Sequence, residues 1–146
     1  MRMRTVFWEV DQLKLIDQRR LPARLEVAGF SAVQDVADAI RSMVVRGAPA
    51  IGVTAAFGLA LAARESRAND KIGLLLDLEV AAKLLRAARP TAVNLDWAVS
   101  RMLVRAREFN GNVVDLCASF SRKSRHVQGA LTITNHHDPF SIEDIQ

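Results

Sequence analysis

The chain has 146 residues, of which 50% are hydrophobic and 25% charged, with a formal net charge of +4 and one cysteine. This composition excludes disorder over most of the chain, a scaffold of internal disulfides, and a membrane-spanning segment, since no uncharged apolar stretch is long enough. The arginines are dispersed, few aromatic residues lie among them and no secretory signal is visible, so we expect a soluble, cytoplasmic protein that binds neither nucleic acid nor membrane.

The first thirty residues are typical of short strands. Residues 5–8 and 13–16 are β-prone, and the polar residues 9–12 between them suit a four-residue hairpin connection. A third short strand is expected at residues 25–27, ended by Gly29. Together these segments predict a small antiparallel sheet.

Helical periodicity begins after Ser31, a candidate N-cap residue. Apolar residues that include Met43 and Val44 share one stripe of this first helix. A second helix is predicted from about Pro49 to about Arg64, and its alanines and glycines indicate a buried central helix.

Two further helices are predicted, over residues 71–88 and from about Ala92 to Phe109, where Asn110 and Gly111 end the pattern. The expected fold class is therefore α+β and mostly helical, with a small N-terminal antiparallel sheet packed against a four-helix layer. We expect residues 1–112 to form this domain. Residues 113–146, where no long periodic pattern resumes, are expected to be a divergent and poorly ordered tail.

Residues 46–52, which read RGAPAIG, suit an oxyanion ligand. The first N–H groups of a helix lack backbone partners, Gly47 permits close approach, and Arg46 supplies a planar charged fork. A tight helix–helix turn with a solvated arginine is an equally good interpretation of this pattern alone. The glycine spacing also resembles a nucleotide-binding P-loop, but Val53 occupies the position of the required lysine, so a P-loop is excluded.

Residues 89–95, which read RPTAVNL, place a second cation beside a helix start. Thr91 or Asn94 is a candidate cap for the helix that follows Arg89. An ordinary structural loop is the simpler interpretation of this segment by itself. Two such loops from one helical layer, however, can converge on one phosphate group.

Three ordered motifs together resemble those of the methylthioribose-1-phosphate isomerases. They are IRSMVVRGAPAIG at residues 40–52, LIDQR at residues 15–19 followed by Leu21 and Pro22, and RPTAVNL at residues 89–95 with Trp97. That family is related to regulatory subunits of a eukaryotic translation-initiation exchange factor and to ribose-1,5-bisphosphate isomerases. The resemblance covers the chain from about Arg4 to Asn110.

This resemblance implies an aldose–ketose isomerase of methionine salvage, which converts 5-methylthioribose 1-phosphate to 5-methylthioribulose 1-phosphate. It further implies that Arg46, Gly47, Ala48 and Arg89 contact the sugar-phosphate substrate. The family uses no metal or organic cofactor and commonly forms homodimers, so we expect no cofactor, no metal, and a homodimer as the family's usual state.

The family's catalytic cysteine and aspartate lie in a C-terminal Rossmann-like domain, and the His-Cys-Asn setting of that cysteine is absent from this sequence. We therefore assign no catalytic residue and expect the chain alone to be a truncated, inactive form that carries half of the substrate site. Cys117 is interpreted as a small buried or incidental residue. The run His136-His137-Asp138 lacks a second cluster of metal ligands and is interpreted as a solvated tail.

Two functions of other classes remain open. One is a non-catalytic helical module that binds a sugar phosphate or a protein partner. The other is a small nucleic-acid binder that uses the dispersed arginines, although the sequence shows no stacking platform for bases.

Overall fold

The computed structural model describes residues 4–119. Three strands are followed by four helices: β1 (Val6–Glu9), β2 (Gln12–Ile16), β3 (Val27–Phe30), α1 (Val33–Arg41), α2 (Ala48–Glu65), α3 (Lys71–Ala88) and α4 (Val93–Glu108). Residues 113–119 are also helical. The mostly helical α+β class with a small N-terminal antiparallel sheet is confirmed, and the predicted bounds of α3 match the observed ones.

The strands form one antiparallel sheet in the order β1-β2-β3. Leu15 of β2 lies between Val6 of β1 and Ala28 of β3 in this register. Because side chains alternate across a sheet, these three residues share one face with Leu13 and Trp8. That face is the one directed at the helices, since Val6, Leu13 and Leu15 are all buried.

Two details of the sheet differ from the expectation. The β1–β2 connection has two residues, Val10 and Asp11, both with positive φ (46° and 62°), where four residues were predicted. The third strand begins later than predicted and continues through Gly29, which pairs with Lys14. Gly29 does not end the strand because the sheet ladder supplies its backbone with partners.

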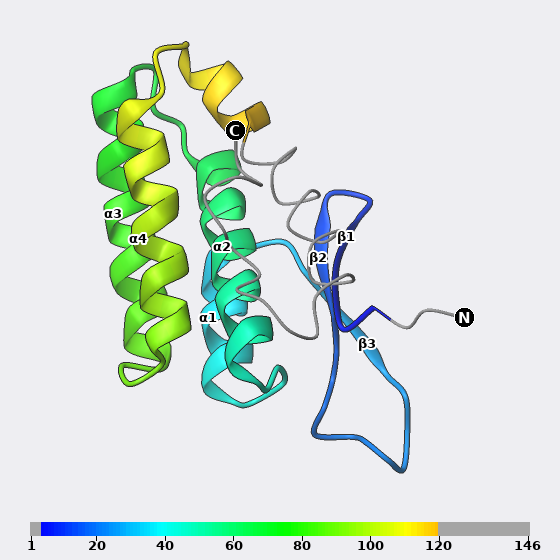
Figure 1. The fold of residues 1–146 in the computed structure, drawn as a ribbon. Coiled ribbons are helices and arrows are strands. Elements are labelled where there is room, and N and C mark those ends of the chain that lie inside the picture. Colours follow the sequence, from blue (N-terminus) through cyan, green and yellow to red (C-terminus); the bar gives the residue numbers. More distant parts are fainter. Residues whose placement is uncertain (1–3, 120–146) are drawn as a thin grey trace.

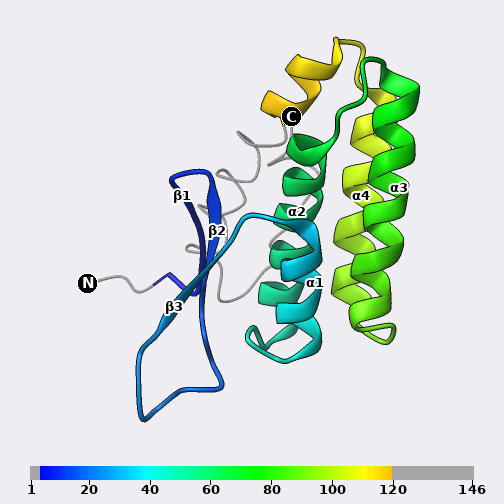
Figure 2. The ribbon, with the colours of Figure 1, turned by 180° about the vertical axis from the view of Figure 1, so that it is seen from behind.

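The elements form three layers, with α2 and α1 between the sheet on one side and α3 and α4 on the other (Figures 1 and 2). Every residue of α2 from Ile51 to Ala63 is buried, which confirms the predicted central helix. Phe57 of α2 stacks on Trp8 of β1 with ring centroids 5.7 Å apart, so this helix links the sheet to the helical layers.

Helix α1 is shorter than predicted at both ends. Its N-cap residue is Ala32, and the Ser31 hydroxyl instead accepts a hydrogen bond from the Gln12 side chain. At the C-terminus the chain turns at Met43, which has φ 62°, and the Val44 N–H donates to the Ala39 carbonyl. This is the hydrogen-bond pattern that ends many helices with a left-handed residue.

Residues 113–119 pack against the hydrophobic core through Leu116, which is 2% exposed. Residues 120–146 lie outside the described part of the chain, and so does the His136-His137-Asp138 run. The boundary placed at residue 112 therefore remains a prediction.

Among the described residues, no helix combines the length and hydropathy needed to cross a membrane.

Candidate functional site

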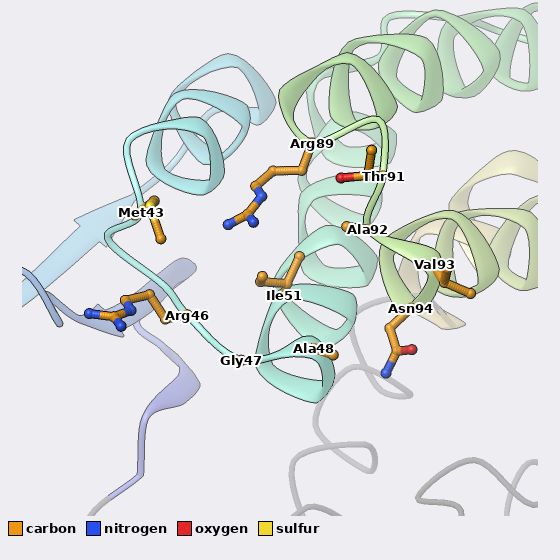
Figure 3. Close-up of a pocket in the computed structure, with 10 residues that line it drawn as sticks. All are labelled: Met43, Arg46, Gly47, Ala48, Ile51, Arg89, Thr91, Ala92, Val93 and Asn94. Carbon is orange, nitrogen blue, oxygen red and sulfur yellow. The ribbon is translucent and has the colours of Figure 1, made fainter.

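A cavity of about 400 Å³ lies where the N-terminal ends of α2 and α4 meet (Figure 3). Its lining comes from two separate loops and the first turns of the helices that follow them. The lining residues are Met43, Arg46, Gly47, Ala48, Ile51, Arg89, Thr91, Ala92, Val93 and Asn94. The two motifs singled out in the sequence, 43 residues apart from Arg46 to Arg89, thus line a single cavity.

Helix α2 begins at the cavity without a side-chain cap. Gly47 is the N-cap residue with φ 91° and ψ 132°, a backbone conformation that side-chain-bearing residues rarely adopt. Pro49 has no N–H, and the Ile51 N–H donates to the Gly47 carbonyl at 2.9 Å. The N–H groups at the very start of α2 are therefore left for a ligand or solvent, and the positive end of the helix dipole lies there.

Helix α4 begins at the same cavity, also without a side-chain cap. Its N-cap residue is Ala92, so the expectation that Thr91 or Asn94 caps this helix is wrong. Thr91 lies one residue too early, and Asn94 is already inside the first turn with its side chain pointing away from Arg89 (Figure 3). Two helix N-termini therefore face one space, a favourable arrangement for an anion.

A close backbone approach holds the two helices at this position. A Cβ atom placed on Gly52 of α2 would lie 3.0 Å from the backbone carbonyl oxygen of Asn94 in α4. Backbone atoms cannot rotate aside as a side chain does, so only glycine fits here without moving a helix. Gly52 thereby sets the separation of the two helix starts.

All four residues predicted to contact substrate (Arg46, Gly47, Ala48 and Arg89) line the cavity, but the two arginines are oriented differently. The Arg89 guanidinium points into the space between Met43 and Ile51, whereas the Arg46 side chain extends away from Arg89 (Figure 3). Arg89 is half-buried and Arg46 exposed. Within residues 4–119, neither guanidinium has an ion-pair partner, so both charges are available to an anion.

Sequence reasoning missed the apolar wall that Met43 and Ile51 form beside Arg89. Met43 was expected on the buried stripe of α1, but the left-handed turn directs it to the cavity, with 43% of it exposed. A residue other than glycine in this conformation gives no signal in the sequence. Ile51 lies in the predicted buried helix, which is confirmed, and its position at the cavity follows from the first turn of α2.

A third motif reaches the Arg46 loop from the sheet. The Gln18 N–H donates to the Val44 carbonyl at 2.9 Å, and the Gln18 side-chain Nε2 donates to the Arg46 carbonyl at 3.4 Å. On either side of Gln18, the buried Asp17 carboxylate accepts from Nε and Nη2 of Arg19 at 2.9 and 2.7 Å. The side-chain hydrogen bond from Arg19 holds the pKa of Asp17 below its usual value.

Replacing Asp17 with asparagine is expected to reduce the free energy of unfolding at pH 7 by about 2 kcal/mol, the scale of a charge-assisted hydrogen-bonded pair. Since the folded-state pKa lies below the usual value of 3.8, the wild-type contribution is complete above about pH 5 and is lost as the pH falls through the folded-state pKa. Urea unfolding at several pH values measures both effects.

The control for this prediction is Glu26→Gln. Glu26 is 44% exposed and ion-pairs with Arg20 and Arg24 at 3.6 and 3.9 Å, so its replacement is expected to change stability by less than about 0.5 kcal/mol. If the difference in the free energy of unfolding between wild type and Asp17→Asn stays constant from pH 7 to pH 3, the assigned role of the carboxylate is contradicted.

Cys117 shows no sign of activation as a nucleophile. Burial raises the pKa of its thiol, and the Sγ donates to the Ala63 carbonyl oxygen at 3.2 Å. A thiol in these surroundings stays protonated at neutral pH. Among the described residues, no group of three or more histidine, cysteine, aspartate or glutamate side chains is placed to hold a metal ion.

The model of the initiation factor 2 subunit family matches residues 44–135, more than half of the chain. The chain belongs to the initiation factor 2 subunit family. The match includes nine of the ten lining residues of the cavity, all except Met43, so most of the cavity lies within the matched region.

Relatives within this family are methylthioribose-1-phosphate isomerases. The protein of Chloroflexus aurantiacus is 57% identical over 106 residues, which cover 73% of this chain and 30% of that protein. That of Thermosynechococcus vestitus is 52% identical over 103 residues, covering 70% of this chain and 29% of the relative. The chain thus spans less than a third of the length of these relatives.

Two solved structures show the same fold. The 5-methylthioribose 1-phosphate isomerase from Pyrococcus horikoshii superimposes with a TM-score of 0.76 at 40% identity, covering 83% of this chain and 34% of that one. A translation initiation factor eIF-2B subunit delta from A. fulgidus gives a TM-score of 0.77 at 40% identity, covering 89% of this chain and 38% of that one.

Proposed function

We propose that this chain supplies the phosphate-anchoring part of the substrate site of a methylthioribose-1-phosphate isomerase. In this role Arg46, Gly47, Ala48 and Arg89 contact the sugar phosphate. The observation that carries the proposal is the convergence of two uncapped helix starts and two guanidinium groups without ion-pair partners on one cavity. The identity of 52–57% to proteins named as such isomerases supports the choice of substrate.

The chemistry of the cavity suits anchoring better than turnover. Conversion of an aldose to a ketose moves a proton or hydride between neighbouring carbons, and this needs a positioned acid, base or equivalent group. The lining contains arginine, amide, hydroxyl and apolar side chains, and none of its residues is a carboxylate, imidazole or thiol. The proposal therefore assigns the chemical step to residues outside this lining, in a further part of the kind that the longer relatives have.

The remaining expectations belong to the same proposal. The protein acts in the cytoplasm, in methionine salvage, without a metal or organic cofactor and without a nucleic-acid partner. A homodimer is the expected assembly of the whole enzyme. The absence of a membrane-spanning helix among the described residues is compatible with this location.

A second function is a non-catalytic binding or interaction module. The observation that favours it is the likeness to the eIF-2B subunit from A. fulgidus, which is as close as the likeness to the isomerase from P. horikoshii. An anion cavity without acid or base groups suits a binding role as well as it suits anchoring. Turnover by the whole protein separates the two functions.

The experiment is a calorimetric titration of the 146-residue chain with 5-methylthioribose 1-phosphate and with 5-methylthioribose. We expect binding of the phosphorylated sugar and at least tenfold weaker binding of the sugar without phosphate, because the anchoring groups act on the anion. Equal affinity for the two sugars would contradict phosphate anchoring.

The same samples are then followed by NMR for formation of the ketose. We expect no product from the chain alone, and product when the chain is part of a protein of the relatives' full length. Ketose formed by the isolated chain would contradict the assignment of the chemical step to another part. Binding without turnover in the full-length protein would favour the binding-module function.

A further inference from the structure

Gln18 connects the sheet to the cavity loop without lining the cavity itself. Its backbone N–H donates to the Val44 carbonyl at 2.9 Å, and its side-chain Nε2 donates to the Arg46 carbonyl at 3.4 Å. The residues that it holds lie 26 and 28 positions later in the sequence. The LIDQR motif that contains Gln18 therefore acts on the loop that carries Arg46 and Gly47.

Peptide geometry gives this contact a direction. The Arg46–Gly47 peptide is trans, so the Arg46 carbonyl and the Gly47 N–H point to opposite sides of one rigid plane. The carbonyl is directed toward Gln18, on the side of the sheet. The Gly47 N–H is consequently directed away from Gln18, and Gly47 is a lining residue of the cavity.

We propose that Gln18 is a positioning residue, which fixes the plane of the Arg46–Gly47 peptide so that the Gly47 N–H faces an anion in the cavity. The inference rests on the proposed function only for the identity of the anion. Gly47 needs such a restraint because glycine has the widest choice of backbone conformations, and its φ of 91° is one of several that it adopts readily. Without the restraint, the peptide plane rotates and the donor turns away.

The residues beside Gln18 hold it in place. Asp17 is 6% exposed, its N–H donates to the Glu26 carbonyl at 2.8 Å, and its carboxylate is bound by Arg19 through two side-chain hydrogen bonds. The Arg19 backbone N–H also donates to Asp17 Oδ1 at 3.0 Å, so backbone hydrogen bonds hold the chain on both sides of Gln18. The side chain at position 18 must carry a donor because its partner is a carbonyl oxygen, which is an acceptor, and the Gln18 amide supplies one.

The first experiment needs no ligand. The ¹⁵N order parameter of Gly47 is measured in wild type, in Gln18→Leu, which removes the donor, and in the control Gln34→Leu. Gln34 is an exposed glutamine of α1 whose side chain contacts Asp38. We expect a lower order parameter at Gly47 in Gln18→Leu alone. An unchanged Gly47 in that variant would overturn the proposal whether or not any sugar phosphate binds.

The second experiment uses inorganic sulfate, a tetrahedral dianion whose charge is constant between about pH 3.5 and 7, with binding followed at the Gly47 amide resonance. A glutamate carboxyl with an ordinary pKa of about 4.3 is mostly protonated at the lower of these two pH values. In Gln18→Leu we expect affinity about three- to tenfold below wild type at both pH values, the effect of one neutral hydrogen bond. In Gln18→Glu we expect sulfate to bind weakly at pH 7. At the lower pH we expect its affinity to rise above that of Gln18→Leu, because the new carboxyl group takes up a proton and becomes a donor.

This comparison separates positioning from simple charge repulsion. Protonation of the carboxyl group removes its repulsion of sulfate in either case, but only a donor to the Arg46 carbonyl raises affinity beyond that of the neutral leucine variant. Recovery that stops at the Gln18→Leu level would overturn the proposal. A further outcome is that wild type binds no sulfate but the order parameter of Gly47 still falls in Gln18→Leu. This result would support the positioning role of Gln18 and contradict the proposed anion site.

Discussion

Replacement of Arg89 with alanine is expected to weaken binding of 5-methylthioribose 1-phosphate by about ten- to a hundredfold, which corresponds to about 1.5–3 kcal/mol for charge-assisted hydrogen bonds. Arg89 is half-buried and directs its guanidinium into the cavity, so its hydrogen bonds to a phosphate are poorly replaced by water. Arg46→Ala is expected to have a smaller effect, because Arg46 is exposed and points away from Arg89. Calorimetry measures both losses.

The matched control is Arg24→Ala. Arg24 has a side chain that is 77% exposed and a weak ion pair with Glu26 at 3.9 Å, and it lies in the loop between β2 and β3, not in the cavity lining. Arg24→Ala removes the same charge from the chain as Arg89→Ala. We expect its affinity for 5-methylthioribose 1-phosphate to stay within about twofold of wild type, because surface charge is screened by salt. Equal losses of affinity in Arg24→Ala and Arg89→Ala would show that binding depends only on the net charge of the chain.

Replacement of Gly52 with valine is expected to destabilise the fold by about 3 kcal/mol, the upper range for inserting atoms into a packed interior. The first added atom would lie 3.0 Å from the Asn94 carbonyl oxygen and 3.4 Å from its carbonyl carbon, so α4 must move away from α2. Urea unfolding followed by circular dichroism measures the loss. The same variant is expected to bind the sugar phosphate more weakly, since the two helix starts no longer face one space.

Gly29→Val is the control for this prediction. A Cβ atom on Gly29 meets the ends of the Lys14 and Gln12 side chains, which are flexible and can move aside. We expect a change in stability of less than about 0.5 kcal/mol there. Wild-type stability in Gly52→Val would contradict the role of Gly52 in spacing α2 and α4.

Long helices were predictable because their periodicity repeats over many turns. The sequence places α3 at its observed bounds and α4 within about one residue at each end, and it identifies α2 as the buried helix. The short elements were less predictable, because single residues decide them. Val10 and Asp11 take positive φ in a two-residue turn, and only Asp11 is of a residue type that favours this conformation.

The candidate site was predictable as a set of loops, but its internal geometry was not. Arginine and glycine before a helix indicate an anion site, and Arg46, Gly47, Ala48 and Arg89 do line one cavity. The directions of the two arginines depend on rotamers that packing decides. The contact of Gln18 with the Arg46 loop joins residues 28 positions apart, and no local pattern reports a contact of that kind.

The burial of α2 limits how this site can change during evolution. The backbone donors at the start of α2 belong to a helix that is buried from Ile51 to Ala63, so substitutions that shift this helix disturb the whole interior. Arg46 and Met43 are exposed, so their replacement does not disturb the interior. Divergence toward other ligands is therefore expected to proceed through the loop residues around the cavity, while the backbone donors at the start of α2 stay the same.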